Sequence, residues 1–536
     1  MAKPGKQWVS SGEGEWIRTP GRRRWRFAAT ALSALTVLAG ASLLQPATAA
    51  ARLPSDANSH GILKYGIDLN DEFDNTFNPE QSLNPCGFAI LSNIYASGLG
   101  ITNTAFTPNA IQSWSTTPNT VTLHLRPGVT FSNGDPVDAN AIKTSLLYSR
   151  QSPLLTTLTA ISTIDVVNPL TLVLNLSNPI PGDVVQAMYH SDGTIYDPRT
   201  IKTDATNPVG AGPFVLTGYN MGSSIKLAAN PKYWNKGQYL LGGVNFVQAS
   251  NGPQIVSGLE TGAFDMTTLE PDEVAAVKGV SNLAVVVGKS YDYVDLQMRQ
   301  NAAPFNDPRV RTALEYAVNR NALNRVVYDG LGEPAYQPFP SWSPGYNQAL
   351  GTKYSYKPTK ARAMLKAAGF PNGISFTLVV PSGDPGFGQA SQLLQQEAKG
   401  AGFNINLQVV TPSDLLTDVY IKGEGDAILT EQLSNGPDLA NNFENEFLPI
   451  GFLTQHYGTA NTMLAPYIKQ ALQYVTAQQQ GPFMQKAGTL AMAIGAEVPL
   501  VFQPSIIGYN KAVVGGSVQA PIGQCHTNLA GIYVKK

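Results

Sequence analysis

Two short apolar strands flank one helical segment between residues 375 and 410, and this arrangement constrains the fold more than any other feature of the chain. Residues 375–380 and 405–410 are rich in Val, Leu, Ile and Phe, and residues 389–399 between them have helical spacing. A strand, a helix and a second strand in this order form a parallel crossover, which needs helices covering the sheet. We therefore predict an α/β fold.

Glycine and proline interrupt the rest of the chain at short intervals. Their 50 and 38 occurrences among 536 residues exclude a long coiled coil or a helical bundle. At about 150 residues per domain, this length allows two to four domains. The pattern predicts a mixed α/β protein with more than one lobe. Further strands are predicted at 62–67, 120–125, 170–176, 224–228 and 243–248, and further helices at 140–150, 307–328, 359–368 and 467–476.

The first 51 residues have the three parts of a secretion signal. Basic residues precede an uncharged apolar run of 17 residues, 28–44, and Ala47-Thr48-Ala49 follows it. We predict cleavage after Ala49 or Ala50. The alternative is a retained membrane anchor, because 17 residues is near the lower limit for a span.

Two features refine the predicted export route. Residues 22–27, RRRWRF, loosely match a twin-arginine signal. Residues 38–41, LAGA, are similar to a bacterial lipoprotein signal, but Ala41 stands where the acylated cysteine would be needed. We therefore expect a periplasmic or otherwise extracytoplasmic protein without a lipid anchor.

The charge balance argues against a polyanionic partner. The chain has 36 basic and 37 acidic side chains, and seven of the basic ones but only two of the acidic ones lie in residues 1–51. The part after the signal therefore carries a net charge of −6. Because nucleic-acid binding depends on basic surface, we expect no nucleic-acid partner.

The chain has two cysteines, Cys86 and Cys525, and both follow the predicted signal. Disulfides persist outside the cytoplasm, and a free thiol is a liability there, so we favour a bond between them. Two unpaired buried thiols are the alternative.

The motifs of common active sites are missing. The chain has no Gly-x-Ser-x-Gly, no His-Glu-x-x-His, no phosphate loop and no Cys-x-x-Cys. Its five histidines are far apart, and its carboxylates are too scattered to indicate an acid/base pair, although ligands from remote residues could still meet. We expect a binding protein, not an enzyme, with no catalytic residue, cofactor or metal.

Several blocks, in order, resemble the family 5 solute-binding proteins of bacterial ABC importers, which include oligopeptide-, dipeptide- and nickel-binding members. The most specific block is PFNDPRVRTALEYAVNRNAL, at residues 304–323. The block at residues 107–150 contains the motif LRPGVTFSNGDP. Together the blocks extend over roughly residues 60–510. They are residues 107–150, 207–237, 259–266, 304–323 and 356–370.

The resemblance implies two lobes that close on a solute by a hinge motion, with a subdomain inserted in lobe I. Cys86 and Cys525 would then both lie on lobe I, where pairing is geometrically sensible. The implied parts are the signal (1–51), lobe I (52–100, 201–293 and 500–536), the inserted subdomain (101–200) and lobe II (294–499).

The resemblance also implies where the solute lies. In peptide-binding members an extended stretch of lobe I pairs with the peptide backbone, and a loop of lobe II carries a Trp and, three residues later, an Asp that binds its ammonium group. The first stretch corresponds here to Gln81, Ser82, Leu83 and Asn84, and the proline that follows them lacks an N–H.

In the lobe II loop, Pro437-Asp438 matches the family's Pro-Asp step, which places Asn435 at the Asp position and Gln432 at the Trp position. Because Asn435 is neutral, a buried ammonium would lack its anion. This departure predicts a solute other than a simple peptide held by its amine. If the correspondence shifts by a few residues, Glu431 or Asp438 would supply the charge instead.

A proline-rich segment of lobe II, residues 333–346, carries four aromatic side chains: Tyr336, Phe339, Trp342 and Tyr346. Such a loop could line the cleft, with Trp342 stacking on the solute, or it could pack within the lobe.

These observations favour the extracytoplasmic substrate-binding component of an ABC importer. It would capture a peptide-like or other small solute and deliver it to permease and ATPase subunits, and we expect a monomer. The alternatives are a secreted hydrolase-type enzyme and a receptor domain that senses a solute without transporting it.

If Cys86 and Cys525 are bonded, the denatured but unreduced exported protein should give almost no signal with a thiol-specific label. The same sample should give two labelled thiols per chain after reduction. Two labelled thiols before reduction would reject the disulfide.

Overall fold

The computed structural model describes residues 53–70, 73–82, 87–102, 105–151, 157–250, 252, 254–383, 385–432, 436–448, 461–520 and 528–536. The predicted secretion signal lies outside these residues, as do Leu83, Asn84, Asn435, Cys86 and Cys525. Cleavage, the disulfide and three of the predicted ligand contacts therefore stay predictions. Within the described part, no helix is both long and apolar enough to cross a membrane.

One mixed sheet runs through most of the described chain. Its β1, β12 and β13 pair in parallel, as do β16, β17 and β18, and antiparallel strands join the two groups. The strand order is β10 (Phe214–Asn220), β11 (Ser224–Ala229), β12 (Gly243–Gln248), β1 (Ile62–Ile67), β13 (Met266–Thr268), β19 (Glu497–Asn510), β14 (Leu283–Met298), β18 (Ala427–Gln432), β16 (Ile374–Pro381) and β17 (Phe403–Val410), and β15 (Glu333–Pro334) pairs with β19.

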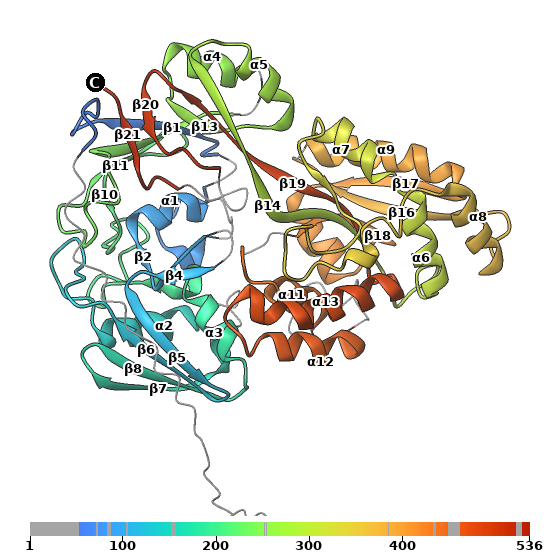
Figure 1. The fold of residues 1–536 in the computed structure, drawn as a ribbon, viewed down its shortest axis with the longest axis horizontal. Coiled ribbons are helices and arrows are strands. Elements are labelled where there is room, and N and C mark those ends of the chain that lie inside the picture. The colour runs from blue at the N-terminus through green and yellow to red at the C-terminus, as the bar shows by residue number, and fades with distance from the viewer. Residues whose placement is uncertain are drawn as a thin grey trace, which may run out of the picture. The chain divides into compact units, whose positions relative to one another are not determined.

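The antiparallel pair β14 and β19 connects the two parallel groups (Figure 1). β19 pairs with β13 near its end, and β14 pairs with β18 from Tyr293 onward. The register between β14 and β19 shifts between Lys289 and Tyr293, and again between Val294 and Asp295. The ladder is therefore interrupted where the chain passes from one group to the other.

A second, four-stranded antiparallel sheet lies within residues 111–176. Its strands follow the order β5 (Ile111–Thr117), β6 (Thr120–Leu125), β8 (Thr171–Leu176) and β7 (Ile161–Asn168), and the two central strands, β6 and β8, bury every second side chain. With α2 (Ala139–Ser149) and α3 (Pro181–Ala187), it forms its own apolar core around Leu123, Ile142 and Leu172. This segment falls within the predicted insertion.

Helices surround β16, β17 and β18, and the core there includes Leu296, Phe376 and Leu378. Helices near the C-terminal end form a further core with Phe443, Leu464 and Met484. The helices of these two regions are α6 (Pro308–Ala317), α7 (Arg320–Val327), α8 (Pro358–Ala367), α9 (Pro385–Gly400), α11 (Asn441–Phe447), α12 (Asn461–Ala471) and α13 (Ala477–Ile494).

Most predicted elements are confirmed, and two helices differ. The helix predicted at 307–328 is two helices, because Val318 is extended and Asn319 caps the second helix. The helix predicted at 467–476 begins at Asn461 and ends at Ala471. Beyond it, the carbonyl of Leu472 accepts the backbone N–H of Asp183, so a tertiary contact replaces helical bonding.

Two arginines of the block 304–323 support the backbone. The Arg311 guanidinium donates to the carbonyls of Ile494 and Gly495, which end α13. Gly495 adopts φ 62°, and an added Cβ would lie 2.7 Å from the Arg311 Cβ, so only glycine fits there.

Arg320 is fully buried and connects three segments. It donates to the carbonyls of Pro499 and Tyr354, and it forms an ion pair with Glu315, which is buried as well. Because a buried charge needs a partner, this pair holds the α6–α7 junction against the start of β19.

Replacing Arg320 with Ala should lower the free energy of unfolding by about 3–5 kcal/mol, because Glu315 would lose its buried partner. Denaturant unfolding followed by circular dichroism measures this. Arg325→Ala, on the exposed side of α7, is the matched control and should change the value by less than about 0.5 kcal/mol. Equal effects of the two changes would contradict the role of Arg320.

Candidate functional site

A small pocket lies beside the irregular part of β14. Most of its wall is aromatic or aliphatic, and it contains one carboxylate. Its accessible volume of about 10 Å³ holds about one water molecule, so a small organic solute would enter only if the wall moved apart. The lining residues are Tyr291, Tyr293, Pro338, Phe339, Asp438, Leu439 and Phe443.

Two of the four aromatic side chains of the proline-rich loop, Phe339 and Trp342, lie at or beside the pocket. Phe339 lines the pocket and stacks on Phe443, with ring centroids 5.3 Å apart, and Trp342 lies 4.3 Å from the Tyr291 ring. Tyr336 lies instead over the Arg320 guanidinium, and the Tyr346 carbonyl accepts a hydrogen bond from Gln485. The loop therefore both lines the pocket and packs within its own lobe.

Asp438 is the carboxylate of the pocket and is only 2% exposed. Its Oδ1 accepts the backbone N–H groups of Ala440 and Asn441, at 3.2 and 3.1 Å, beside the start of α11. Its Oδ2 has no hydrogen-bond partner among the described residues. Burial raises the pKa of Asp438 to about 6, against the effect of these N–H donors.

Two further carboxyl groups, Asp183 of α3 and Glu444 of α11, lie near Asp438. Burial raises the pKa of both, and the negative charges of Glu444 and Asp438 raise that of Asp183 further. Asp183 reaches this position because α3 packs on the segment after α12. There Gln186 donates to the carbonyl of Val475 at 2.9 Å.

Sequence reasoning missed Asp183, Glu444 and the two β14 tyrosines. Asp183 stands alone after a Pro-Gly step, and no spacing relates it to α11. Tyr291 and Tyr293 follow an alternating strand pattern that is typical of core residues as well. No local signal could have found them.

The remaining predicted ligand residues lie in two places. Gln432 ends β18 opposite Tyr293, is 7% exposed, and places its Nε2 3.5 Å from Asp295 Oδ1. Gln81 ends the short helix η1 (Pro79–Gln81) and accepts a hydrogen bond from Thr76.

Ser82 follows η1 and donates to Asp74 at 3.0 Å. The structure thus places Asp438 in the pocket wall, Trp342 against the Tyr291 ring of that wall, and Gln432 opposite Tyr293. Gln81 and Ser82 instead bond to their own segment.

Glu80, in η1, bridges this segment to the second sheet's helix. Its Oε1 accepts hydrogen bonds from Ser149 at 2.5 Å and from Tyr196 at 3.3 Å. Burial nevertheless raises the pKa of Glu80 to about 7, and burial together with the charge of Glu80 raises the pKa of Asp192.

The raised pKa of Glu80 predicts a pH dependence of stability. Between pH 4.5 and about 7, the folded chain keeps a proton on Glu80 that the unfolded chain has released. The stabilisation that Glu80 contributes is therefore full below pH 4.5 and is lost as the pH rises through about 7, by about 3 kcal/mol.

Denaturant unfolding of the wild type and of Glu80→Gln at several pH values across this window measures the effect. The difference between their unfolding free energies should change by that amount, whereas Glu260→Gln, an exposed control, should follow the wild type. Parallel profiles of the wild type and Glu80→Gln would contradict the assignment.

Comparison with known proteins gives a consistent result. The family description "Bacterial extracellular solute-binding proteins, family 5 Middle" matches residues 105–449. A glutathione-binding protein GsiB of Salmonella paratyphi A is 26% identical over 371 residues, which cover 65% of this chain and 70% of that protein. GsiB of Escherichia coli O1:K1 / APEC is 25% identical over 415 residues, 74% of this chain and 80% of that protein.

Solved structures show the same fold. The binding protein AgaA of A. tumefaciens, in complex with agropinic acid, superposes with a TM-score of 0.76 at 21% identity, over 89% of this chain and 99% of that chain. DppA of Helicobacter pylori, in complex with the peptide STSA, superposes with a TM-score of 0.72 at 20% identity, over 89% and 98%.

Proposed function

The chain belongs to the bacterial extracellular solute-binding proteins of family 5 and is the substrate-binding component of an ABC importer, and from this premise we propose that it holds its solute at the pocket beside Asp438. Its relatives are binding proteins and not enzymes, and the hydrolase alternative finds no support among them. Proteins of this family are periplasmic and work with ABC permeases. For this chain we propose export by a cleaved signal, and action as a monomer.

The α/β chain has the two-lobed fold of the family, and we propose that its hinge lies at the interrupted ladder of β14 and β19. Loss of regular pairing near Tyr293 lowers the resistance of the two strands to bending. The proposed boundary between lobe I and lobe II, at residues 293 and 294, falls within this stretch. The pocket residues Tyr291 and Tyr293 lie beside it, so closure would act directly on the solute.

One observation carries the choice of site: Asp438 has a buried oxygen without a hydrogen-bond partner in the described chain, and it faces an aromatic pocket. A carboxylate beside aromatic rings favours a solute that carries an ammonium or another strong donor. We therefore propose that Asp438 supplies the charge that Asn435 lacks. Trp342 and Tyr291 would contact the apolar part of a peptide-like or other small solute.

Asp438→Asn should weaken binding of an amine-bearing solute at least tenfold. Asparagine retains an oxygen for the N–H groups of Ala440 and Asn441, so the helix start should stay intact while the charge is lost. Native mass spectrometry identifies the co-purified solute, and calorimetric titration with free and N-acetylated small peptides measures the loss.

Asn435→Asp is the comparison variant. If Asp438 provides the anion, this change should leave affinity nearly unaltered. A tenfold gain in Asn435→Asp, together with unchanged binding in Asp438→Asn, would show that the neighbouring loop position decides specificity instead.

A further inference from the structure

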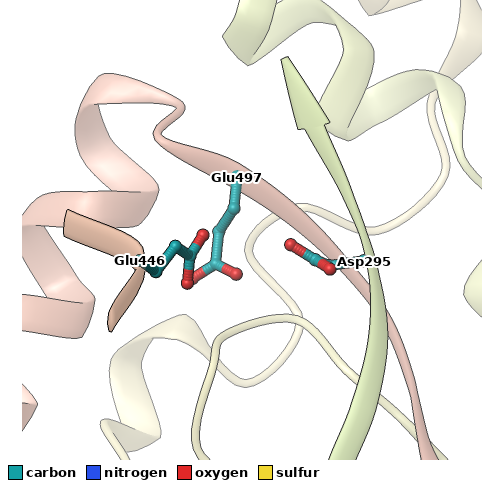
Figure 2. A group of neighbouring side chains, drawn as sticks. All are labelled: Asp295, Glu446 and Glu497. Carbon is teal, nitrogen blue, oxygen red and sulfur yellow. The ribbon is translucent and has the colours of Figure 1, made fainter. Parts of the chain in front are cut away.

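Three buried carboxylates meet at the junction of β14, β19 and α11. They belong to Asp295, Glu446 and Glu497, and one oxygen of each lies within 4.8 Å of the others (Figure 2). Their exposed fractions are 0%, 3% and 0%. Three acids so completely withdrawn from water need a compensating charge or protons.

The surrounding protein supplies little compensation. Tyr293 donates its hydroxyl to Glu497 Oε2 at 2.9 Å, and Gln432 approaches Asp295 Oδ1 at 3.5 Å. None of the three acids forms an ion pair with a described residue, and the buried Arg320 nearby is paired with Glu315.

Each acid also has a buried oxygen that no described donor reaches. These oxygens are Asp295 Oδ2, Glu446 Oε2 and Glu497 Oε1. Figure 2 shows the Asp295 carboxylate, which comes from β14, directed toward the other two. Each such buried oxygen needs a partner, which a proton, a water molecule or a cation can supply, and a single cation would serve all three at once.

We propose that Asp295, Glu446 and Glu497 bind one divalent cation, and that this cation is Ca²⁺. Carboxylate oxygens are the ligands that hard cations prefer. Ca²⁺ accepts several carboxylates in a flexible geometry, whereas Mg²⁺ usually keeps several waters and takes one or two carboxylates, so three fully buried carboxylates suit Ca²⁺.

Gln432 offers a fourth ligand. Its amide oxygen and nitrogen can exchange places by a half rotation, which would present the oxygen to the cation. This assignment gives Gln432 a role in the metal site instead of a direct contact with the solute.

The cation would fix one wall of the pocket. Tyr293 lines that pocket with its ring and donates its hydroxyl to Glu497, so an ion on Glu497 holds the tyrosine in place. The ion would also join β14 and β19 to α11 beside the interrupted ladder. The metal site itself does not depend on which solute the protein carries.

Titration of the purified protein with Ca²⁺, after removal of metal by EDTA and dialysis, tests the proposal. Calorimetry at pH 7.5 and elemental analysis by mass spectrometry should give one Ca²⁺ per chain. The melting temperature should rise with the logarithm of free Ca²⁺. Glu446→Gln and Asp295→Asn should each weaken Ca²⁺ binding at least tenfold, and Glu260→Gln should bind like the wild type.

Both variants keep the side-chain shape and remove a buried negative charge, so their melting temperatures in EDTA should equal or exceed that of the wild type. This measurement separates loss of the site from loss of the fold, and Glu446→Gln alone suffices if Asp295→Asn is unstable. Absence of Ca²⁺ uptake at millimolar concentration would overturn the proposal. Equal uptake by Glu446→Gln, or tighter binding of Mg²⁺ than of Ca²⁺, would overturn it as well.

Discussion

The antiparallel pairing of β14 with β19 is the contact on which the rest of the structure depends. The two strands, of 16 and 14 residues, form the pairing that links the two parallel groups of the described chain. The register of this pairing shifts between Lys289 and Tyr293, where we propose that the hinge lies. Tyr291, Tyr293 and Asp295 follow within six residues, so the proposed hinge, pocket and metal site share one strand.

The most specific sequence block supports the backbone of this region. Residues 304–323 contain Arg311, which caps the end of α13, and Arg320, which reaches the carbonyl of Pro499 in β19. Both are buried cations with carbonyl partners at separate places in the sequence. A family-specific motif can therefore reflect the contacts that stabilise the lobe without identifying the ligand.

The second feature shared by the pocket and the proposed metal site is a group of buried acidic side chains. Asp438 lines the pocket with Asp183 and Glu444 near it, and Asp295, Glu446 and Glu497 form a second group that Tyr293 contacts through its hydroxyl. Burial raises the pKa of all six by disfavouring their charged forms, and repulsion from a neighbouring acid raises it further for Asp183, Glu444, Asp295 and Glu446. The net charge of −6 after the predicted signal does not predict these two groups of acids, because a count of charges does not tell which residues lie close together in the fold.

The sequence by itself determined the fold class, most element positions and the family, because strand alternation, helix caps and motif order are local properties. The strand at 62–67 and the cap at Asp138 are where the patterns place them. It also indicated Trp342 and Asp438, through a proline-rich loop and a Pro-Asp step. Only the tertiary structure decided that Asp183 lies beside Asp438 and that Gln432 faces Asp295. Those contacts join residues more than one hundred positions apart, and nothing local to either partner encodes the other.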